Sequence, residues 1–425
     1  MTHDAHGAID AVWRIESARL IAGLARVVRD VGLAEDLAQD ALVAALEQWP
    51  ESGVPANPGA WLMATAKHKA VDRLRRVKSL ERKHEEIARE LEVHEEPDLA
   101  AQADDDIGDD LLSLIFTACH PVLSTEGRIA LTLRLVGALT TAEIARAFLA
   151  SEATVAQRIV RAKRTLAEAQ VPIEVPTGDD RHERLASVLE VVYAIFNEGY
   201  AATAGEDWMR LELCADALRL GRILACLAPQ EPEVHGLLAL MEIQASRSRA
   251  RAGPSGEAIL LLDQDRSRWD RLLIGRGLAA LERARALGGA TGPYALQAAI
   301  VACHARALRP EETDWEAIVA LYDALGQITP SPVIELNRAM AIAMAFGPAQ
   351  GLVLVDGLAE EGSLDGYHLL PAVRGDLLAK LDRPGEARGE FERAATLTRN
   401  ERERAVLLGR ADDCDARRRY SSRSL

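Results

Sequence analysis

The amino-acid sequence predicts an all-α protein, and three observations support that prediction. Ala, Leu, Arg and Glu dominate the 425 residues, and all four favour helices. Aromatic residues, which favour strands, make up only 4% of the chain. Apolar residues recur every three or four positions, as at Leu37, Ala41 and Ala44, which is the spacing of an amphipathic helix. A chain of this length is expected to form about three domains.

The first predicted domain covers residues 9–84 and consists of helices separated by two clusters of helix-breaking residues. The clusters are residues 49–53 and 55–59, and each contains Pro and Gly. We therefore expect helices to end and begin again around these two clusters.

Two further domains follow, each after a linker. Residues 85–110 are strongly acidic and predict a solvated linker, and residues 111–170 predict a second small helical domain. A second linker, residues 171–178, contains two prolines and a glycine. The third predicted domain, residues 180–412, is a long helical array.

The array has the character of a helical repeat. Gly375, Ala387, Phe391 and Ala394 match the small, small, bulky and small positions of a tetratricopeptide helix pair, in which small residues let two helices approach closely. Several helices in the array are predicted to start at a proline, which favours the first helical turn. The alternative is an irregular helical domain in which one segment matches the repeat pattern by chance.

The composition excludes several classes of protein. No apolar run approaches the roughly 20 residues that a membrane-spanning helix needs. The first residues lack the basic and apolar regions of a secretory signal, so we expect a soluble cytoplasmic protein. No C-x-x-C pair occurs, which argues against a zinc ribbon or a disulfide framework, and we predict neither a metal nor a cofactor. The five cysteines are scattered along the chain: Cys119, Cys214, Cys226, Cys303 and Cys414.

The net charge of −15 hides an uneven distribution. Residues 67–83 carry eight basic and two acidic residues, whereas residues 85–110 carry twelve acidic residues and one basic residue. Residues 111–170 are basic again, with seven basic and four acidic residues. Two basic regions separated by an acidic stretch are compatible with nucleic-acid binding despite the overall charge.

Residues 141–164 have the pattern of a helix-turn-helix motif. Ala145 is the small residue at which the two helices cross, and Ile144, Phe148, Val155 and Ile159 would form their apolar contact. Ser151 can cap the second helix. That helix directs polar and basic side chains outward, which suits contacts with bases and phosphates in a major groove. A helical hairpin with an exposed basic face is the alternative interpretation.

Two amphipathic helices are predicted in the first domain. Residues 34–47 have an acidic outer face that also carries Gln39, and residues 60–76 have an apolar stripe with a basic outer face. Taken alone, each helix is typical of an ordinary protein surface.

Together, these motifs resemble the extracytoplasmic-function group of bacterial RNA polymerase sigma factors. Residues 35–40 resemble the helix of region 2 that binds core polymerase, and residues 58–76 resemble the segment that contacts the promoter −10 element. Residues 131–135 together with 141–164 resemble region 4, which contacts the −35 element. The resemblance covers residues 16–169 and implies two small sigma-factor domains with no region 3 between them.

The resemblance implies two partners, core RNA polymerase through its beta and beta-prime subunits and promoter DNA, and it implies no membrane contact and no enzymatic activity. The residues that would bind core polymerase are Glu35, Asp36, Gln39 and Asp40. His68 stands where many members of the group have Asn. The residues that would bind DNA are Trp61, Lys67, His68, Lys69, Arg73, Arg76, Thr154, Gln157, Arg158, Arg161, Lys163 and Arg164.

The long third domain resembles the tetratricopeptide-like extension of one subgroup of these sigma factors. The resemblance lies in residues 193–200, 263–270 and 294–300. We expect the extension to regulate activity in cis, with an unidentified regulatory protein or ligand as a further partner. The predicted regulatory contact is Asn197, Glu198 and Tyr200, and the alternative is that the aromatic residues of this segment simply pack the first layer of the array.

Two other functions are compatible with parts of the sequence. A one-component helix-turn-helix regulator with a sensing repeat domain would explain the third domain but gives no role to the acidic helix or to the Trp61 helix. An enzyme could use Asp263, Asp265, Asp270 and His304, but the sequence contains no metal-ligand spacing and no phosphate-binding loop. We therefore expect these acids to stabilise a turn.

Overall fold

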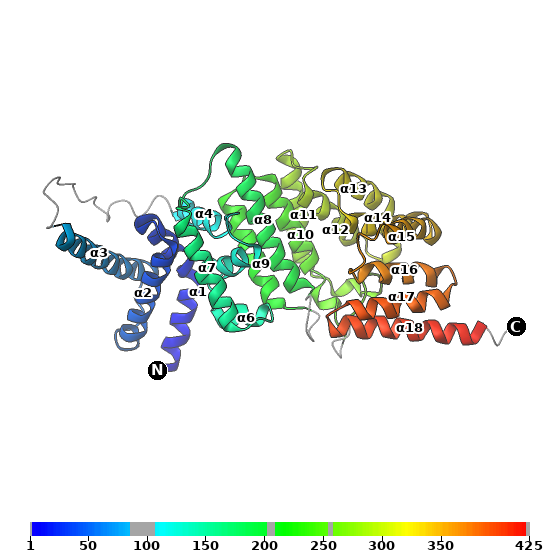
Figure 1. Ribbon diagram of the computed structural model, residues 1–425, viewed down its shortest axis with the longest axis horizontal. Coiled ribbons are helices and arrows are strands. Elements are labelled where there is room, and N and C mark those ends of the chain that lie inside the picture. The colour runs from blue at the N-terminus through cyan, green and yellow to red at the C-terminus, as the bar shows by residue number, and fades with distance from the viewer. Residues whose placement is uncertain (1, 86–106, 202–208, 254–257, 422–425) are drawn as a thin grey trace. The chain divides into compact units, whose positions relative to one another are not determined.

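The computed structural model describes residues 2–85, 107–201, 209–253 and 258–421, without the side chains of residues 2–6, 72–85, 107, 179 and 416–421 (Figure 1). These residues form eighteen α-helices and no strand, with a single isolated bridge between Ala252 and Ala258. The prediction of an all-α protein is confirmed. No helix among the described residues is both long and apolar enough to cross a membrane.

The chain divides into two compact units, residues 1–192 and 193–425. The first unit begins with a three-helix group in which each helix contacts the other two. Asp30 caps the second of these helices by accepting a hydrogen bond from the backbone N–H of Leu33 at 2.7 Å. The helices of this group are α1 (Thr2–Val28), α2 (Val31–Ser52) and α3 (Pro58–Glu85).

One of the two expected helix breaks differs from the prediction. Helix α2 continues through Pro50 and ends at Ser52, and Gly53 then takes a positive φ of 83°. Pro50 is tolerated because it lies in the last turn of a long helix that already packs against two others. The second predicted break is confirmed, since α3 begins at Pro58.

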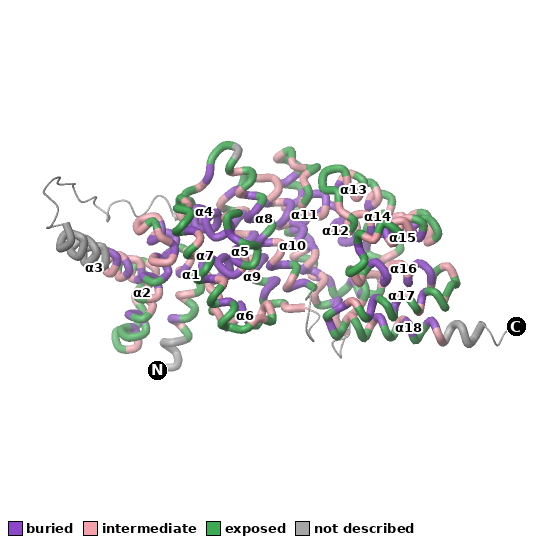
Figure 2. The backbone as a smooth tube through the Cα atoms, viewed as in Figure 1, coloured by how far each residue is buried: buried purple, intermediate pink, exposed green. Residues whose placement is uncertain are grey.

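Four further helices complete the predicted second domain: α4 (Ile107–Ala118), α5 (Thr125–Leu135), α6 (Thr141–Ala147) and α7 (Glu152–Glu168). Three of them start with hydroxyl caps, at Ser124, Thr140 and Ser151. Helix α7 packs on α5 and α6, and α4 packs on α1, so both predicted small domains belong to one compact unit. Figure 2 shows that buried residues recur along each of these helices.

Helix α8 (Gly178–Tyr200) crosses the boundary between the two units. Its first half packs on the predicted second domain, because Arg184 donates a hydrogen bond to the backbone oxygen of Phe116 and the Ser187 hydroxyl donates one to that of Cys119. Arg128 of α5 also donates to the Ser187 hydroxyl and pairs with Glu190 at 3.0 Å. The compact first unit therefore extends beyond the boundary that the sequence predicted at residue 180.

The second unit is a succession of helices in which each packs against its neighbour in the chain (Figure 1). Gly375 of α16 approaches Phe391 of α17 so closely that a Cβ there would lie 2.9 Å from the ring. The close pairing predicted from Gly375, Ala387, Phe391 and Ala394 is thus observed, and the last three are buried. The helices are α9 (Leu211–Leu227), α10 (Pro232–Ala245), α11 (Arg271–Ala286), α12 (Pro293–Arg306), α13 (Trp315–Ile328), α14 (Pro332–Phe346), α15 (Pro348–Glu361), α16 (Leu369–Lys380), α17 (Pro384–Leu397) and α18 (Glu401–Ser421).

Candidate nucleic-acid and polymerase interface

The helix-turn-helix is formed by α6 and α7. Ile144 and Ala145 of α6 are buried, as predicted, and the turn passes through Leu149 with a positive φ of 47°. The Ser151 hydroxyl accepts a hydrogen bond from the backbone N–H of Thr154 at 3.1 Å and caps α7. The buried residues of α7 recur at helical spacing: Val155, Ile159, Ala162 and Leu166. The opposite face of α7 is therefore free to contact a groove.

The six predicted DNA-binding residues of α7 divide into two groups. Thr154, Gln157, Arg161 and Arg164 are exposed on the outward face. Arg158 and Lys163 are half-buried, because each lies three or four positions from a residue of the buried row. Helical spacing alone could have placed these two at the edge of the core.

The basic helix α3 carries the residues predicted to contact the −10 element. His68 is exposed, while Trp61, Lys67 and Lys69 are half-buried. The Lys69 amine donates a hydrogen bond at 2.8 Å to the backbone oxygen of Asp40 on α2. Arg73 and Arg76 lie in α3, but their side chains are outside the described residues.

The ring of Trp61 contacts a second aromatic ring that the sequence pattern does not predict. Its ring meets that of the buried Trp49 edge to face, with the two ring centroids 5.3 Å apart. Trp49 lies before the loop that joins α2 to α3, and Trp61 lies just after it. The Asn57 side chain in this loop accepts a hydrogen bond from the backbone N–H of Ala60 at 3.1 Å. Both ends of the loop are thus fixed by local contacts.

The acidic helix α2 only partly matches its predicted outer face. Asp36 and Asp40 are exposed, as expected. Glu35 is not, since only 4% of its side chain is accessible. Gln39 is half-buried and donates a hydrogen bond to Glu35 Oε1 at 2.7 Å. Glu35 and Gln39 therefore face the interior, because residues of the helix-turn-helix domain cover that side of the helix.

Two cations from the helix-turn-helix domain hold Glu35. Arg134 of α5 donates a hydrogen bond from Nε to Glu35 Oε1 at 2.6 Å, and Lys163 of α7 forms an ion pair with Glu35 Oε2. Burial by itself would raise the pKa of Glu35, but Lys163 and Arg134 outweigh burial and lower that pKa. The carboxylate is therefore charged, and it links the acidic helix to the recognition helix.

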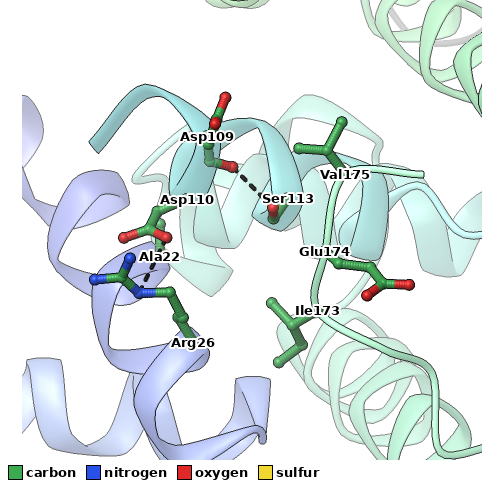
Figure 3. Close-up of a pocket in the computed structure, with 8 residues that line it drawn as sticks. All are labelled: Ala22, Arg26, Asp109, Asp110, Ser113, Ile173, Glu174 and Val175. Atoms are coloured by element: carbon green, nitrogen blue, oxygen red, sulfur yellow. Dashed lines mark hydrogen bonds and ion pairs between the residues drawn. The ribbon is translucent and has the colours of Figure 1, made fainter. Parts of the chain in front are cut away.

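A hollow of about 270 Å³ lies where α1, α4 and residues 173–175 meet (Figure 3). Arg26 of α1 pairs there with Asp110 of α4 at 3.3 Å, and Ser113 donates a hydrogen bond to the backbone oxygen of Asp109. These polar groups satisfy one another, and the described part of the chain holds no cluster of His, Cys, Asp or Glu suited to a metal ion. We therefore interpret the hollow as a gap in the packing between helices and not as a binding site.

Three segments of the chain match models of known protein families. Residues 15–79 match the family model of sigma-70 region 2, and residues 113–166 match that of sigma-70 region 4. Residues 184–285 match a family of unknown function (DUF6596). An uncharacterized protein of Rhizobium meliloti (strain 1021), R00370, is 43% identical over 408 residues, which are 96% of each chain.

The chain belongs to the same family as that protein and is a sigma-70-type factor. It therefore binds core RNA polymerase and promoter DNA. The match to region 2 accounts for the acidic and Trp61 helices, which a one-component regulator would leave unexplained. No solved structure matches the chain.

Sigma factors are not enzymes. Of the four residues named above for a possible enzyme, Asp265 and Asp270 stabilise local structure, His304 is buried and Asp263 is exposed. Asp265 accepts hydrogen bonds from the backbone and hydroxyl of Ser267, and Asp270 caps α11. His304 is buried, and burial together with Arg247 and Arg266 lowers its pKa to about 3. Asp263 is exposed in a short 3₁₀ turn.

The three predicted regulatory residues lie in or beside the core of the extension. Tyr200 is buried, stacks on Phe196 with centroids 5.5 Å apart, and lies 3.7 Å beneath the Arg251 guanidinium. Glu198 is half-buried and pairs with Arg210. Asn197 is exposed. The surroundings of Tyr200 favour the packing alternative for this residue.

Proposed function

We propose that this sigma factor belongs to the extracytoplasmic-function group and starts transcription at promoters with paired −35 and −10 elements. The observation that carries the proposal is the exposed row Thr154, Gln157, Arg161 and Arg164 on a capped recognition helix. The family matches leave residues 80–112 between regions 2 and 4, which leaves little room for a region 3. That spacing is the arrangement of the extracytoplasmic-function group.

Core polymerase is proposed to bind α2 through Asp36 and Asp40. Both carboxylates are exposed and one helical turn apart, so a basic helix of the beta-prime subunit can face them together. Glu35 and Gln39, by contrast, take part only if the contacts that cover them open. Lys163 is proposed to contact DNA backbone under the same condition.

Opening of the −10 element is proposed to use α3 and the loop before it. Trp61 stands beside the loop and is steadied by Trp49, so it offers a fixed aromatic surface to a base that leaves the duplex. His68 and the two lysines then lie along the helix toward its C-terminal half. Unstacking a base costs a few kcal/mol, which contacts in this loop offset.

The experiment that tests this function is transcription by core polymerase with and without the full-length chain. Transcript starts are mapped genome-wide after overexpression, and the strongest promoter is then transcribed in a purified system. Initiation at mapped starts that depends on this chain supports the proposal. Binding to those promoters without any initiation would instead favour a conventional regulator.

We further propose that the extension regulates the sigma regions in cis. Its helices carry both signs of charge, and Arg374, for example, pairs with Asp356 and Glu390, so the extension is not built as a DNA clamp. A stacked helical array offers a long surface for a protein, a peptide or a ligand. Truncation of the extension would reveal whether it activates or inhibits transcription.

A further inference from the structure

The outward face of the recognition helix α7 carries a second row of side chains beside its polar row. The polar row consists of Thr154, Gln157, Arg161 and Arg164, at successive spacings of three, four and three. The second row is apolar and has successive spacings of three, four and seven: Ala153, Ala156, Val160 and Ala167. All four of its residues are exposed. The two rows lie side by side on the surface that is proposed to face DNA.

Val160 dominates the apolar row. It exposes 65% of its surface, whereas the other residues of the row are alanines whose side chains are one methyl group long. Val160 therefore projects beyond its neighbours toward the groove, between Gln157 and Arg164 along the helix. Exposure of a branched apolar side chain to water is unfavourable, so its burial against a partner would lower the free energy. The residues beside it are of the types that contact base edges and phosphates.

The major groove offers an apolar side chain one distinctive target. The four bases present donors and acceptors there, and thymine alone adds a methyl group, at C5. A valine side chain contacts this methyl group but cannot pair with a donor or acceptor. We infer that Val160 is a specificity residue that contacts the C5 methyl group of a thymine in the −35 element.

The positive charge next to Val160 favours duplex DNA as the partner of this surface. Arg164 is exposed on the adjoining row, and a cation at the edge of the surface attracts the DNA phosphates. An α-helix fills the major groove, so contacts from Gln157 and Arg161 bring Val160 against the base edges at the same time. This inference rests on the proposed contact between α7 and the −35 element and adds one base identity to it.

The test removes a single methyl group from the DNA. Once the −35 element has been mapped, each of its thymines on either strand is replaced in turn by deoxyuridine. Binding of full-length holoenzyme to the labelled promoter is measured for wild-type protein and for Val160→Ala. Val122→Ala serves as the control, because Val122 is also an exposed valine but lies in the loop between α4 and α5.

Burial of one methyl group corresponds to about a fourfold change in affinity. We expect one uridine substitution to weaken wild-type binding about fourfold and to have no effect on Val160→Ala. The control variant should retain the wild-type sensitivity. Coupling between the side chain and the methyl group is thereby measured as a double-mutant cycle.

The inference would be overturned if wild-type holoenzyme bound every uridine-substituted promoter as tightly as the unmodified promoter. A −35 element that contains no thymine on either strand would also overturn it. Loss of core polymerase binding by Val160→Ala would also overturn it, because Val160 would then face the polymerase. Failure of the proposed function is distinguishable. In that case wild-type holoenzyme would bind a promoter with a scrambled −35 element as tightly as the native one.

Discussion

Lys163 of the recognition helix α7 and Glu35 of the acidic helix α2 form an ion pair. Arg134 Nε contacts the other carboxylate oxygen of Glu35, Oε1, at 2.6 Å. A residue predicted to bind polymerase and a residue predicted to bind DNA thus neutralise each other within one compact unit. Neither side chain reaches its proposed partner while this contact persists.

Replacing Glu35 by Gln should lower the free energy of unfolding by about 2 kcal/mol at neutral pH, because two cations lose their charged acceptor. The folded protein lowers the pKa of Glu35, so its contribution is fully present above the unfolded value of 4.5 and is lost as the pH falls through the folded value. The difference between wild type and Glu35→Gln should therefore shrink in acid. Chemical unfolding at several pH values measures it.

Glu168→Gln is the matched control for this experiment. Glu168 pairs with Arg164 at 3.4 Å, but both side chains are about two-thirds exposed. Its replacement should change stability by less than about 0.5 kcal/mol at any pH. Similar losses in the two variants would mean that the contact around Glu35 contributes no more than an ordinary surface pair.

Reversing the charges of Asp36 and Asp40 to Lys should abolish copurification with core polymerase and leave the fold intact, because both residues face solvent. The same substitutions at Asp412 and Asp413, which are exposed on α18, control for the change in net charge. Circular dichroism checks the fold of both variants. Undiminished polymerase binding by the α2 variant would contradict the assignment of this helix.

Arg161→Ala should reduce output from a native promoter about tenfold or more, because a good base contact contributes about 1–3 kcal/mol. Arg158→Ala, also at a predicted DNA-binding residue, should have a smaller effect because Arg158 is half-buried at the edge of the domain core. Transcription from native promoters and from promoters with scrambled −35 elements measures both. An equal loss on the two kinds of promoter would make Arg161 a phosphate contact.

Gly375→Ala should destabilise the extension by about 1–3 kcal/mol, because the new methyl group would lie 2.9–3.0 Å from the Phe391 ring. Gly389→Ala is the matched control, since Gly389 lies in α17 with open space around its Cβ position and gains helix propensity. Thermal unfolding of the full chain compares the two. A neutral Gly375→Ala would mean that α16 and α17 can separate at little cost.

Truncation after Val192 should yield a folded sigma unit whose transcription differs from that of the full chain, because the proposed regulator is absent. Truncation after Thr177 also removes Ser187 and Glu190, which Arg128 contacts, so this shorter chain should be less stable. Transcription at the mapped promoter and thermal unfolding separate the two effects. If the 192-residue chain transcribed at the level of the full-length chain under every condition, the extension would not be a regulator.

The sequence predicted local features more accurately than tertiary ones. Helical periodicity and capping residues identified the helix-turn-helix, and Ile144, Ala145, Val155 and Ile159 are buried as expected. Glu35 was misplaced because its burial depends on Arg134, which lies 99 positions further along the chain. An amphipathic pattern tells which face of a helix is apolar, but it does not tell whether a second domain covers a polar face.

The path of α8 has a consequence for protein engineering. The proline-containing segment before it looks like a natural place to join the sigma regions to another module. The first half of α8, however, supplies Arg184 and Ser187 to backbone oxygens of the region 4 domain. A chimaera that exchanges extensions between two sigma factors should therefore keep this half-helix with its own region 4 and be spliced after Val192, inside a continuous helix.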